Sequence, residues 1–420
     1  MPNSTTRFAC FTLITLGACS STGAPPLDAG ATDAPRDGGG SDAARTEDAS
    51  RDGGGSDAAR TDAARTDDAA PPPLASCARE TTVIARDDAW VRGAGIAPLG
   101  EGWAIVVHRP SGAALMRVDA DGTVLGETEL RQEPSSTRSS AQIAALGDGV
   151  LVADDSRLRF FDAAGVEARG PVDDVTRPLF GPDEGDTAFV VSGDELLEIS
   201  IDGRALSVAR TPIEIEGIDV AALGPPLDGY VSRSSIGIGA GGCLIIGEQA
   251  SASYEVVLRT IPIGDAPCSA SEHRIADAGS IGSYAASAST TLAIVGHDPG
   301  PDHSRDHTPR IASIALDGTL ALAAPFGTGL HYGPLASIAA LDDALVVATR
   351  SAATYGASRA ELWVIGADAP LLVASEGASE LTGVHAAAAR DGVRAAAIWG
   401  LDSPRYLEPE HTLGLRCISR

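Results

Sequence analysis

One pattern recurs along most of this chain: a short apolar stretch, a turn that contains Gly or Asp, and a second, more strongly apolar stretch. Because the copies follow one another at intervals of roughly fifty residues, their period is that of a repeat architecture. A single unit of this kind cannot bury its apolar face alone and must pack against its neighbours. The copies lie at Ile96–Val107, Ile143–Asp154, Leu179–Val191, Ile236–Gly247, Tyr284–Gly296, Ile338–Thr349 and Val384–Gly400.

A second hairpin follows most copies, again with a turn residue at its tip. Gly at such a tip supplies a positive φ, and alternating apolar residues on either side set the strand register. Two hairpins in each repeat make a four-stranded antiparallel unit, and a ring of such units leaves only short, protected edges. These second hairpins lie at Leu115–Glu127, Leu158–Ala168, Leu196–Val208 and Ile311–Leu322.

The sequence therefore predicts an all-β domain folded as a seven-bladed β-propeller. The segment Pro212–Arg233 fits either a long loop between two blades or an extra hairpin, so six or eight blades stay open as alternatives. The sequence lacks the WD dipeptide, the kelch glycine pairs and the Asp-box. The chain thus resembles β-propellers in general and no particular subfamily.

The cysteines are expected to fasten this ring. With strands lettered A to D outward from the axis, the A–B and C–D turns share one face, and the B–C and D–A connections share the other. Cys243 and Cys268 then lie on one face of the fourth blade. Cys77 precedes Glu80–Arg86, which supplies the missing D strand of the last blade, and Cys417 ends that blade's C strand. We predict the disulfides Cys243–Cys268 and Cys77–Cys417.

The first residues indicate where the protein is located. After Arg7 comes a short apolar run, and Leu16-Gly17-Ala18-Cys19 resembles a bacterial lipobox. The resemblance implies a lipoprotein signal peptide over residues 1–18 and a diacylglycerol on Cys19, usually with a third acyl chain such as palmitate. Because Ser20 stands where an aspartate would favour the inner membrane, we expect an outer-membrane lipoprotein that faces the periplasm or the cell surface. An ordinary signal peptide is the alternative.

Residues 19–76 are predicted to form a disordered linker between this anchor and the domain at 77–420. RDGGGSDAART occurs at Arg36–Thr46 and again at Arg51–Thr61, and large apolar residues are nearly missing. Such a segment cannot bury enough surface to offset the entropy of ordering. The linker would hold the domain away from the membrane.

Charge excludes several classes of function. The net charge of −26 argues against nucleic acid and against direct binding to an anionic membrane surface. All 31 basic residues counted as Lys or Arg are arginine, which excludes a Walker P-loop, a Schiff-base lysine and a kinase lysine. We expect a monomer that meets the membrane only through its lipid and binds envelope proteins or a small ligand.

A histidine-rich segment, GHDPGPDHSRDHTPR at Gly296–Arg310, offers ligands for a divalent metal such as zinc. In the predicted topology it is the B–C loop of the fifth blade, with His331 and His411 on the same face; a solvated loop without a metal is the alternative. A GxGxxG motif at Gly237–Gly242 precedes a strand, so glycine packing explains it better than a nucleotide. The candidate metal ligands are His297, Asp302, His303, Asp306 and His307.

The same face collects half of the chain's tyrosines and tryptophans, with arginines nearby, as is typical of an interface. We therefore predict a membrane-anchored binding or scaffold module without catalytic residues. The alternative is a metal-assisted lyase or hydrolase that uses the His297–His307 loop, and a structural coat protein is a third hypothesis. The predicted binding face consists of Trp90, Tyr230, His331, Tyr332, Tyr355 and Tyr406.

Overall fold

The structure is a computed structural model. It describes residues 81–87, 91–131, 143–154, 156–176, 178–183, 186–202, 205–223, 234–250, 255–287, 289–297, 306–327, 330–331, 336–342, 344–354, 357–366, 370–378, 380–389, 391–402 and 411–419. The chain divides into two units, 1–68 and 69–420, and the first lies wholly outside the described residues. In the part that is described, no helix is long and apolar enough to cross a bilayer.

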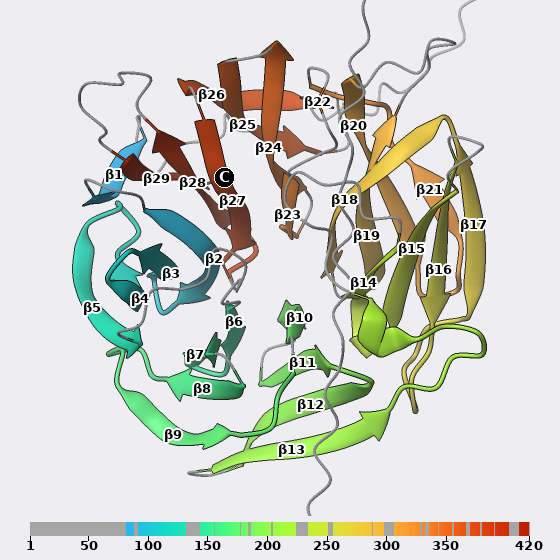
Figure 1. Ribbon diagram of the computed structural model, residues 1–420, viewed down its shortest axis with the longest axis horizontal. Coiled ribbons are helices and arrows are strands. Elements are labelled where there is room, and N and C mark those ends of the chain that lie inside the picture. Colours follow the sequence, from blue (N-terminus) through green and yellow to red (C-terminus); the bar gives the residue numbers. More distant parts are fainter. Residues whose placement is uncertain are drawn as a thin grey trace, which may run out of the picture. The chain divides into compact units, whose positions relative to one another are not determined.

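Seven antiparallel sheets form a ring in the second unit, and the predicted seven-bladed β-propeller is confirmed (Figure 1). Each predicted repeat supplies the two inner strands of one blade. Blade 1 contains β2 (Arg92–Leu99), β3 (Gly102–Arg109), β4 (Gly112–Val118) and β5 (Val124–Arg131). Blade 2 contains β6 (Ile143–Leu146), β7 (Gly149–Asp154), β8 (Arg157–Phe161) and β9 (Glu167–Val172). Blade 3 contains β10 (Leu179–Asp183), β11 (Thr187–Ser192), β12 (Glu195–Asp202) and β13 (Ala205–Pro212).

The next three blades repeat this arrangement. Blade 4 contains β14 (Ser234–Ile238), β15 (Leu244–Ala250), β16 (Glu255–Ile261) and β17 (Ser271–Ala276). Blade 5 contains β18 (Ala278–Ser287), β19 (Thr290–His297), β20 (Asp306–Ala315) and β21 (Leu320–Leu322), and the short β22 (Leu330–His331) also pairs with β20. Blade 6 contains β23 (Ala336–Ala340), β24 (Leu345–Thr354), β25 (Ala357–Ile365) and β26 (Leu371–Ala378).

Blade 7 closes the ring with strands from both ends of the domain. It contains β27 (Glu380–Ala388), β28 (Arg394–Asp402), β29 (His411–Ser419) and, as its outer strand, β1 (Thr82–Asp87). β1 runs antiparallel to β29, which confirms that the segment at Glu80–Arg86 completes the last blade. Blade 6 reinforces this closure, because Glu376 accepts hydrogen bonds from the Thr81 hydroxyl and, at 3.2 Å, from the indole N–H of Trp399.

The core consists of seven apolar clusters, one in each seam between neighbouring blades. In β3, Trp103, Ile105 and Val107 face the seam with blade 7. Ala104 and Val106, on the other side of that strand, face the seam with blade 2. Strand B is therefore apolar on both faces because each blade is packed on both sides, which explains the unbroken apolar runs in the repeat.

The glycine-rich stretch before β15 is explained by close packing. A Cβ at Gly237 would lie 2.5 Å from the ring of Tyr284, and one at Gly242 would lie 2.9 Å from the ring of Phe189. The hydroxyl of Tyr284 forms a 2.7 Å hydrogen bond with Ser235, and burial raises the pKa of this phenol. Glycine is thus required so that blades 3, 4 and 5 can approach one another near the axis.

The predicted disulfide between Cys243 and Cys268 is present, with the two Cα atoms 6.3 Å apart. It joins the A–B and C–D turns of blade 4 on one face of the ring. Cys417 on β29 is also disulfide-bonded. Its predicted partner Cys77 lies outside the described residues, as does Cys19, so the Cys77–Cys417 pairing and the lipidation stay predictions.

Candidate functional site

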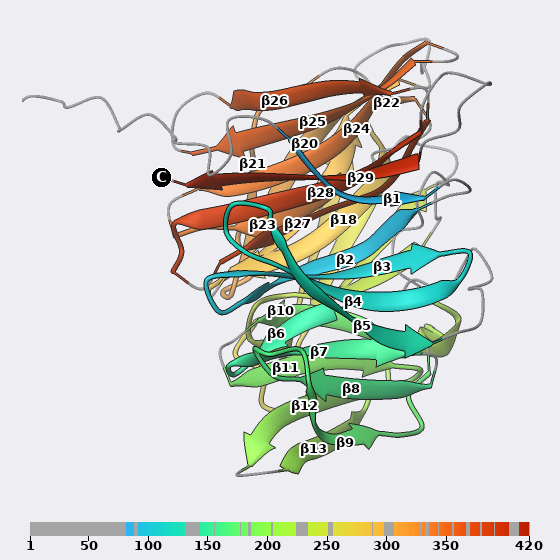
Figure 2. The same ribbon diagram turned by 90° about the vertical axis from the view of Figure 1, so that its left-hand side faces the viewer.

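All strands run between two faces of the ring, which Figure 2 shows from the side. The A–B and C–D turns form what we call the turn face. The B–C turns and the D–A connections form the opposite face, which we call the loop face. Of the residues predicted to bind a partner or a metal, four lie at loop-face ends of described strands: His297, Asp306, His307 and His331.

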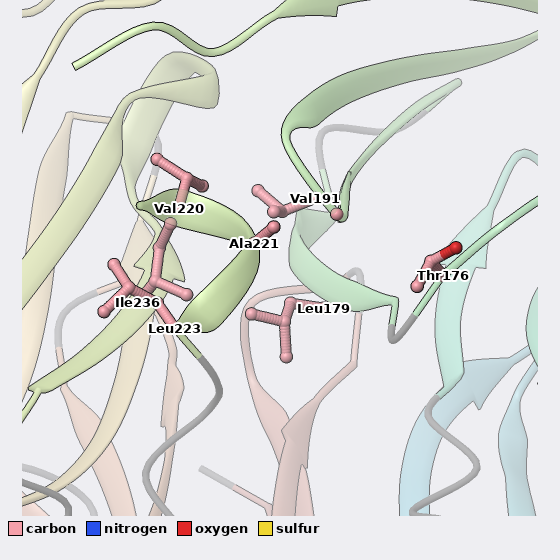
Figure 3. Close-up of a pocket in the computed structure, with 8 residues that line it drawn as sticks. Thr176, Leu179, Val191, Val220, Ala221, Leu223 and Ile236 are labelled. Atoms are coloured by element: carbon pink, nitrogen blue, oxygen red, sulfur yellow. The ribbon is translucent and has the colours of Figure 1, made fainter. Parts of the chain in front are cut away.

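A cavity of about 290 Å³ opens on the loop face between blades 3 and 4 (Figure 3). In Figure 3, Val220, Leu223 and Ile236 lie on one side of this space, and Leu179 and Val191 lie on the other. The cavity is at the lower end of the size range of ligand sites. Its wall is formed by Thr176, Leu179, Val191, Gly193, Val220, Ala221, Leu223 and Ile236.

The segment between β13 and β14 builds one wall of this cavity. Its first residue, Ile213, is buried, and its backbone N–H donates a 2.7 Å hydrogen bond to the carbonyl of Asp194. A bridge between Ile215 and Ile218 and a single 3-10 turn, η1 (Val220–Ala222), follow. Of the two alternatives for Pro212–Arg233, its described part therefore favours a connection between blades, with no strand of its own after β13.

The opposite wall comes from blade 3 and the connection that precedes it. The hydroxyl of Ser192 accepts a hydrogen bond from the N–H of Thr176 at 2.9 Å, and the N–H of Gly193 donates to the carbonyl of Thr176 at 3.0 Å. These bonds fix the connection between blades 2 and 3 against the B–C turn of blade 3. The cavity lining contains no ionisable side chain and combines aliphatic side chains with polar groups of Thr176 and the backbone, so the site can take an uncharged group and offers no acid or base.

The three segments that form the cavity wall also contain exposed acidic residues. Arg210 on β13 is paired with Glu195, at 2.8 Å, and also donates to the carbonyl of Asp173. Thr176, Gly193 and Val220 of the cavity wall each have an acidic residue within two positions in the chain. Among the described residues of these three segments, the charged side chains are therefore acidic. The exposed carboxylates are Asp173, Asp174, Asp194, Glu214, Glu216 and Asp219.

A buried histidine lies at the loop-face end of blade 1. His108 is only 4% exposed, and among the described residues its Nε2 has no hydrogen-bond partner. Burial, with the positive charges of Arg131 and Arg92, lowers the pKa of His108 to about 4. The imidazole is thus neutral near pH 7. It lies in the seam with blade 2, away from the cavity between blades 3 and 4.

The histidine-rich segment predicted to bind metal is only partly described. His297 ends β19 and Asp306 begins β20, while Asp302 and His303 lie outside the described residues. The register places Asp306 opposite His331 on β22. Within the described ranges, no three His, Cys, Asp or Glu side chains are grouped to hold a metal ion, so the metal site stays a prediction.

The predicted aromatic binding face lies almost entirely outside the described residues, because only His331 of that set belongs to a strand, β22. Sequence reasoning missed the cavity instead. The available signal was the sequence IEIEGIDVAAL at 213–223, whose recurring apolar residues follow a complete blade and belong to no strand of the repeat. The residues of the predicted face that lie outside the described part are Trp90, Tyr230, Tyr332, Tyr355 and Tyr406.

The fold and the cavity define a β-propeller with an apolar site at the loop face. No protein-family model matches the sequence, and no curated protein matches it. Among solved structures, the chain is similar to Kluyveromyces lactis Hsv2, with 10% identity over 77% of this chain and 98% of that chain and a TM-score of 0.38. It is similar to Citrobacter koseri AztD, with 12% identity over 67% of this chain and 69% of that one and a TM-score of 0.35. It is also similar to the polysaccharide lyase Uly1, with 9% identity over 78% and 90% of the two chains and a TM-score of 0.45.

Proposed function

We propose that this chain is an outer-membrane lipoprotein whose β-propeller binds an envelope protein through its loop face. The observation that carries this proposal is the apolar cavity at that face, which offers buried contact area to a ligand group. The sequence of the loop-face connections supports the same face, because it concentrates tyrosine and tryptophan there.

The anchor and the linker belong to the same proposal. Two or three acyl chains on Cys19 would hold the protein stably, whereas one chain would hold it only marginally. A flexible linker over residues 19–76 would let the rigid domain search the space beside the membrane. Confinement of both partners to one compartment raises their effective concentration without any new contact.

Crosslinking and affinity capture from intact cells test this function, with the full-length chain compared with Cys19→Ala. Cys10→Ala is the matched control, since Cys10 lies in the apolar run of the same signal segment. We expect labelled palmitate and a specific envelope protein on the wild type and on Cys10→Ala, and neither on Cys19→Ala. Capture that is equal in all three, or empty capture from a well-expressed and lipidated chain, would contradict the proposal.

A metal-assisted lyase or hydrolase is the second candidate function. The pairing of β20 with β22 supports it, because it places Asp306 and His331 at opposite positions of neighbouring strands. This candidate requires stoichiometric zinc on the purified chain, lost in His303→Ala and His307→Ala. His273→Ala is the control, since the ring of His273 bonds to the carbonyl of Gly318 on another part of the molecule. Absence of bound zinc at micromolar concentrations would eliminate it.

A further inference from the structure

We propose that the cavity between blades 3 and 4 binds an aliphatic side chain of a partner protein, at a point where lysine or arginine flanks that side chain. This inference rests on the proposed function and specifies the ligand chemistry of the loop face. It is carried by two independent features of the described residues: the apolar lining of the cavity and the sign of the charge around it.

The lining selects an aliphatic group. Leu179, Val191 and Ile236 come from strands at the seam of the two blades, and Val220 and Leu223 come from the connection that covers it. When a branched side chain enters this space, apolar surface of both the side chain and the cavity wall is removed from water, which favours binding. A volume of about 290 Å³ is sufficient for a side chain and too small for most cofactors.

The charge around the cavity selects cationic neighbours. Six exposed carboxylates lie on the three segments that form the wall, and Arg210 on the adjoining strand is already paired with Glu195. A lysine or arginine next to the inserted side chain would be attracted at several ångströms, and an acidic one would be repelled. A fatty acid or an anionic lipid would bring its own negative charge to this rim, so we favour a peptide over an acyl chain.

Aspartates at the turn face stabilise their own turns, whereas Asp219 at the cavity does not. Asp119 and Asp162 each accept two backbone N–H groups within their own turns. Asp219, by contrast, stands at the N-cap of η1 and makes no side-chain capping hydrogen bond. The exposed carboxylate of Asp219 is therefore not engaged in capping its own helical turn, unlike the two turn-face aspartates.

The test uses the full-length chain and fluorescent peptides. The probe has one leucine between two lysines within a glycine chain, and its two relatives replace the leucine by alanine or the lysines by glutamates. We expect anisotropy titrations at low salt to give the leucine–lysine peptide an affinity about tenfold higher than either relative. High salt is expected to remove most of the difference between lysine and glutamate, because exposed charges are screened.

Variants locate the binding. Ala221 is exposed at the cavity, and Ala221→Trp is expected to fill the space and weaken the peptide on the order of tenfold. Ala163→Trp, at an exposed alanine of a turn-face hairpin, is the matched control and is expected to leave the affinity unchanged. The double variant Glu216→Gln and Asp219→Asn is expected to weaken binding about threefold at low salt and not at high salt.

Three results would overturn the inference: equal affinities of the leucine and alanine peptides, unchanged affinity in a folded Ala221→Trp chain, or tighter binding of decanoate than of the peptide. The same variant separates this inference from the proposed function. If Ala221→Trp still captures the anchor-dependent partner in cells, the proposed function stands and the cavity is not the contact. If Cys19→Ala and Ala221→Trp both lose that partner, both proposals are supported.

Discussion

The two faces of this propeller are built by different means. At the turn face, two short hairpin turns are stabilised in the same way, by an aspartate that accepts backbone hydrogen bonds. The Oδ1 atom of Asp119 accepts the N–H groups of Asp121 and Thr123, at 3.0 and 2.7 Å. Asp162 does the same for Ala164 and Val166, at 2.9 Å each. These two turns are therefore determined locally, whereas on the same face the A–B turn of blade 4 contains a 3-10 turn, Ala240–Gly242, and is joined by a disulfide to the C–D connection of that blade.

The loop face is formed by connections that differ from blade to blade. The connection between blades 2 and 3 spans residues 173–178, whereas the one between blades 3 and 4 spans 213–233 and contributes Val220 and Leu223 to a cavity. The repeat therefore specifies the blades and the short hairpin turns that join their strands. The cavity lies where a longer connection departs from the repeat.

The largest expected effect that tests this contrast comes from two glycine substitutions. At the turn face, a Cβ on Gly149 would overlap the carbonyl oxygen of Phe161 and the ring of Phe160. At the loop face, Gly193 has φ +62° and open space around it. We expect Gly149→Ala to lower the free energy of unfolding by about 3 kcal/mol through overpacking, and Gly193→Ala by about 1 kcal/mol through its backbone conformation alone.

Urea unfolding followed by circular dichroism measures both glycine variants. Gly102→Ala is the internal check, because a Cβ there would overlap the carbonyl oxygen of Val118 at the corresponding position of blade 1. If Gly149→Ala and Gly193→Ala lower the free energy of unfolding by the same amount, the packing around the two glycines does not differ as described.

The second prediction concerns pH and the loop-face end of blade 1. The pKa of His108, about 4 in the folded protein, lies below the usual 6.5, so the unfolded chain binds a proton first as pH falls. Stability is therefore lost between pH 6.5 and 4, by about 3 kcal/mol from this group. His108→Leu is expected to lack this loss. The free energy of unfolding of the variant should therefore rise relative to that of the wild type as the pH falls across this window. Parallel pH curves for the two proteins would contradict the buried, neutral imidazole.

The smallest expected effect separates turn chemistry from surface charge. Asp119→Ala removes the acceptor of two backbone N–H groups and is expected to cost about 1 kcal/mol. Asp121→Ala, two positions away and exposed, removes the same charge and is expected to change stability by less than about 0.5 kcal/mol. Thermal unfolding at low and high salt measures both. If both variants respond alike and salt abolishes the effect, charge and not turn geometry is what matters at this face.

The fold could be predicted because its signals are local and repeated. Each copy, such as Ile143–Asp154, contains its own two strands and the turn between them. Every hairpin therefore gives independent evidence for the same fold. The disulfide of Cys243 with Cys268 followed from the same reasoning, because strand order alone places both on one face of blade 4. Ring closure by β1 was predictable for a related reason: the first strand of the domain had no partner of its own, and the last blade lacked an outer strand.

The cavity could not be predicted in this way. Its wall combines Thr176, Leu179, Val191 and Ile236 with a connection of irregular backbone, and contacts among these residues depend on how two blades pack. Nor does the sequence show that His108 is neutral. Its pKa depends on burial in the seam with blade 2 and on Arg131, a neighbour brought close by strand pairing.

By itself, the sequence determined the blade repeat, the closure of the ring and the chemistry of its turns, because strand alternation and turn geometry are encoded within a few residues. Only the tertiary structure decided which connection encloses a cavity, which glycines admit a neighbouring blade and which titratable group is buried. These properties depend on distances between residues far apart in the chain, and such distances are fixed only when all seven seams have packed.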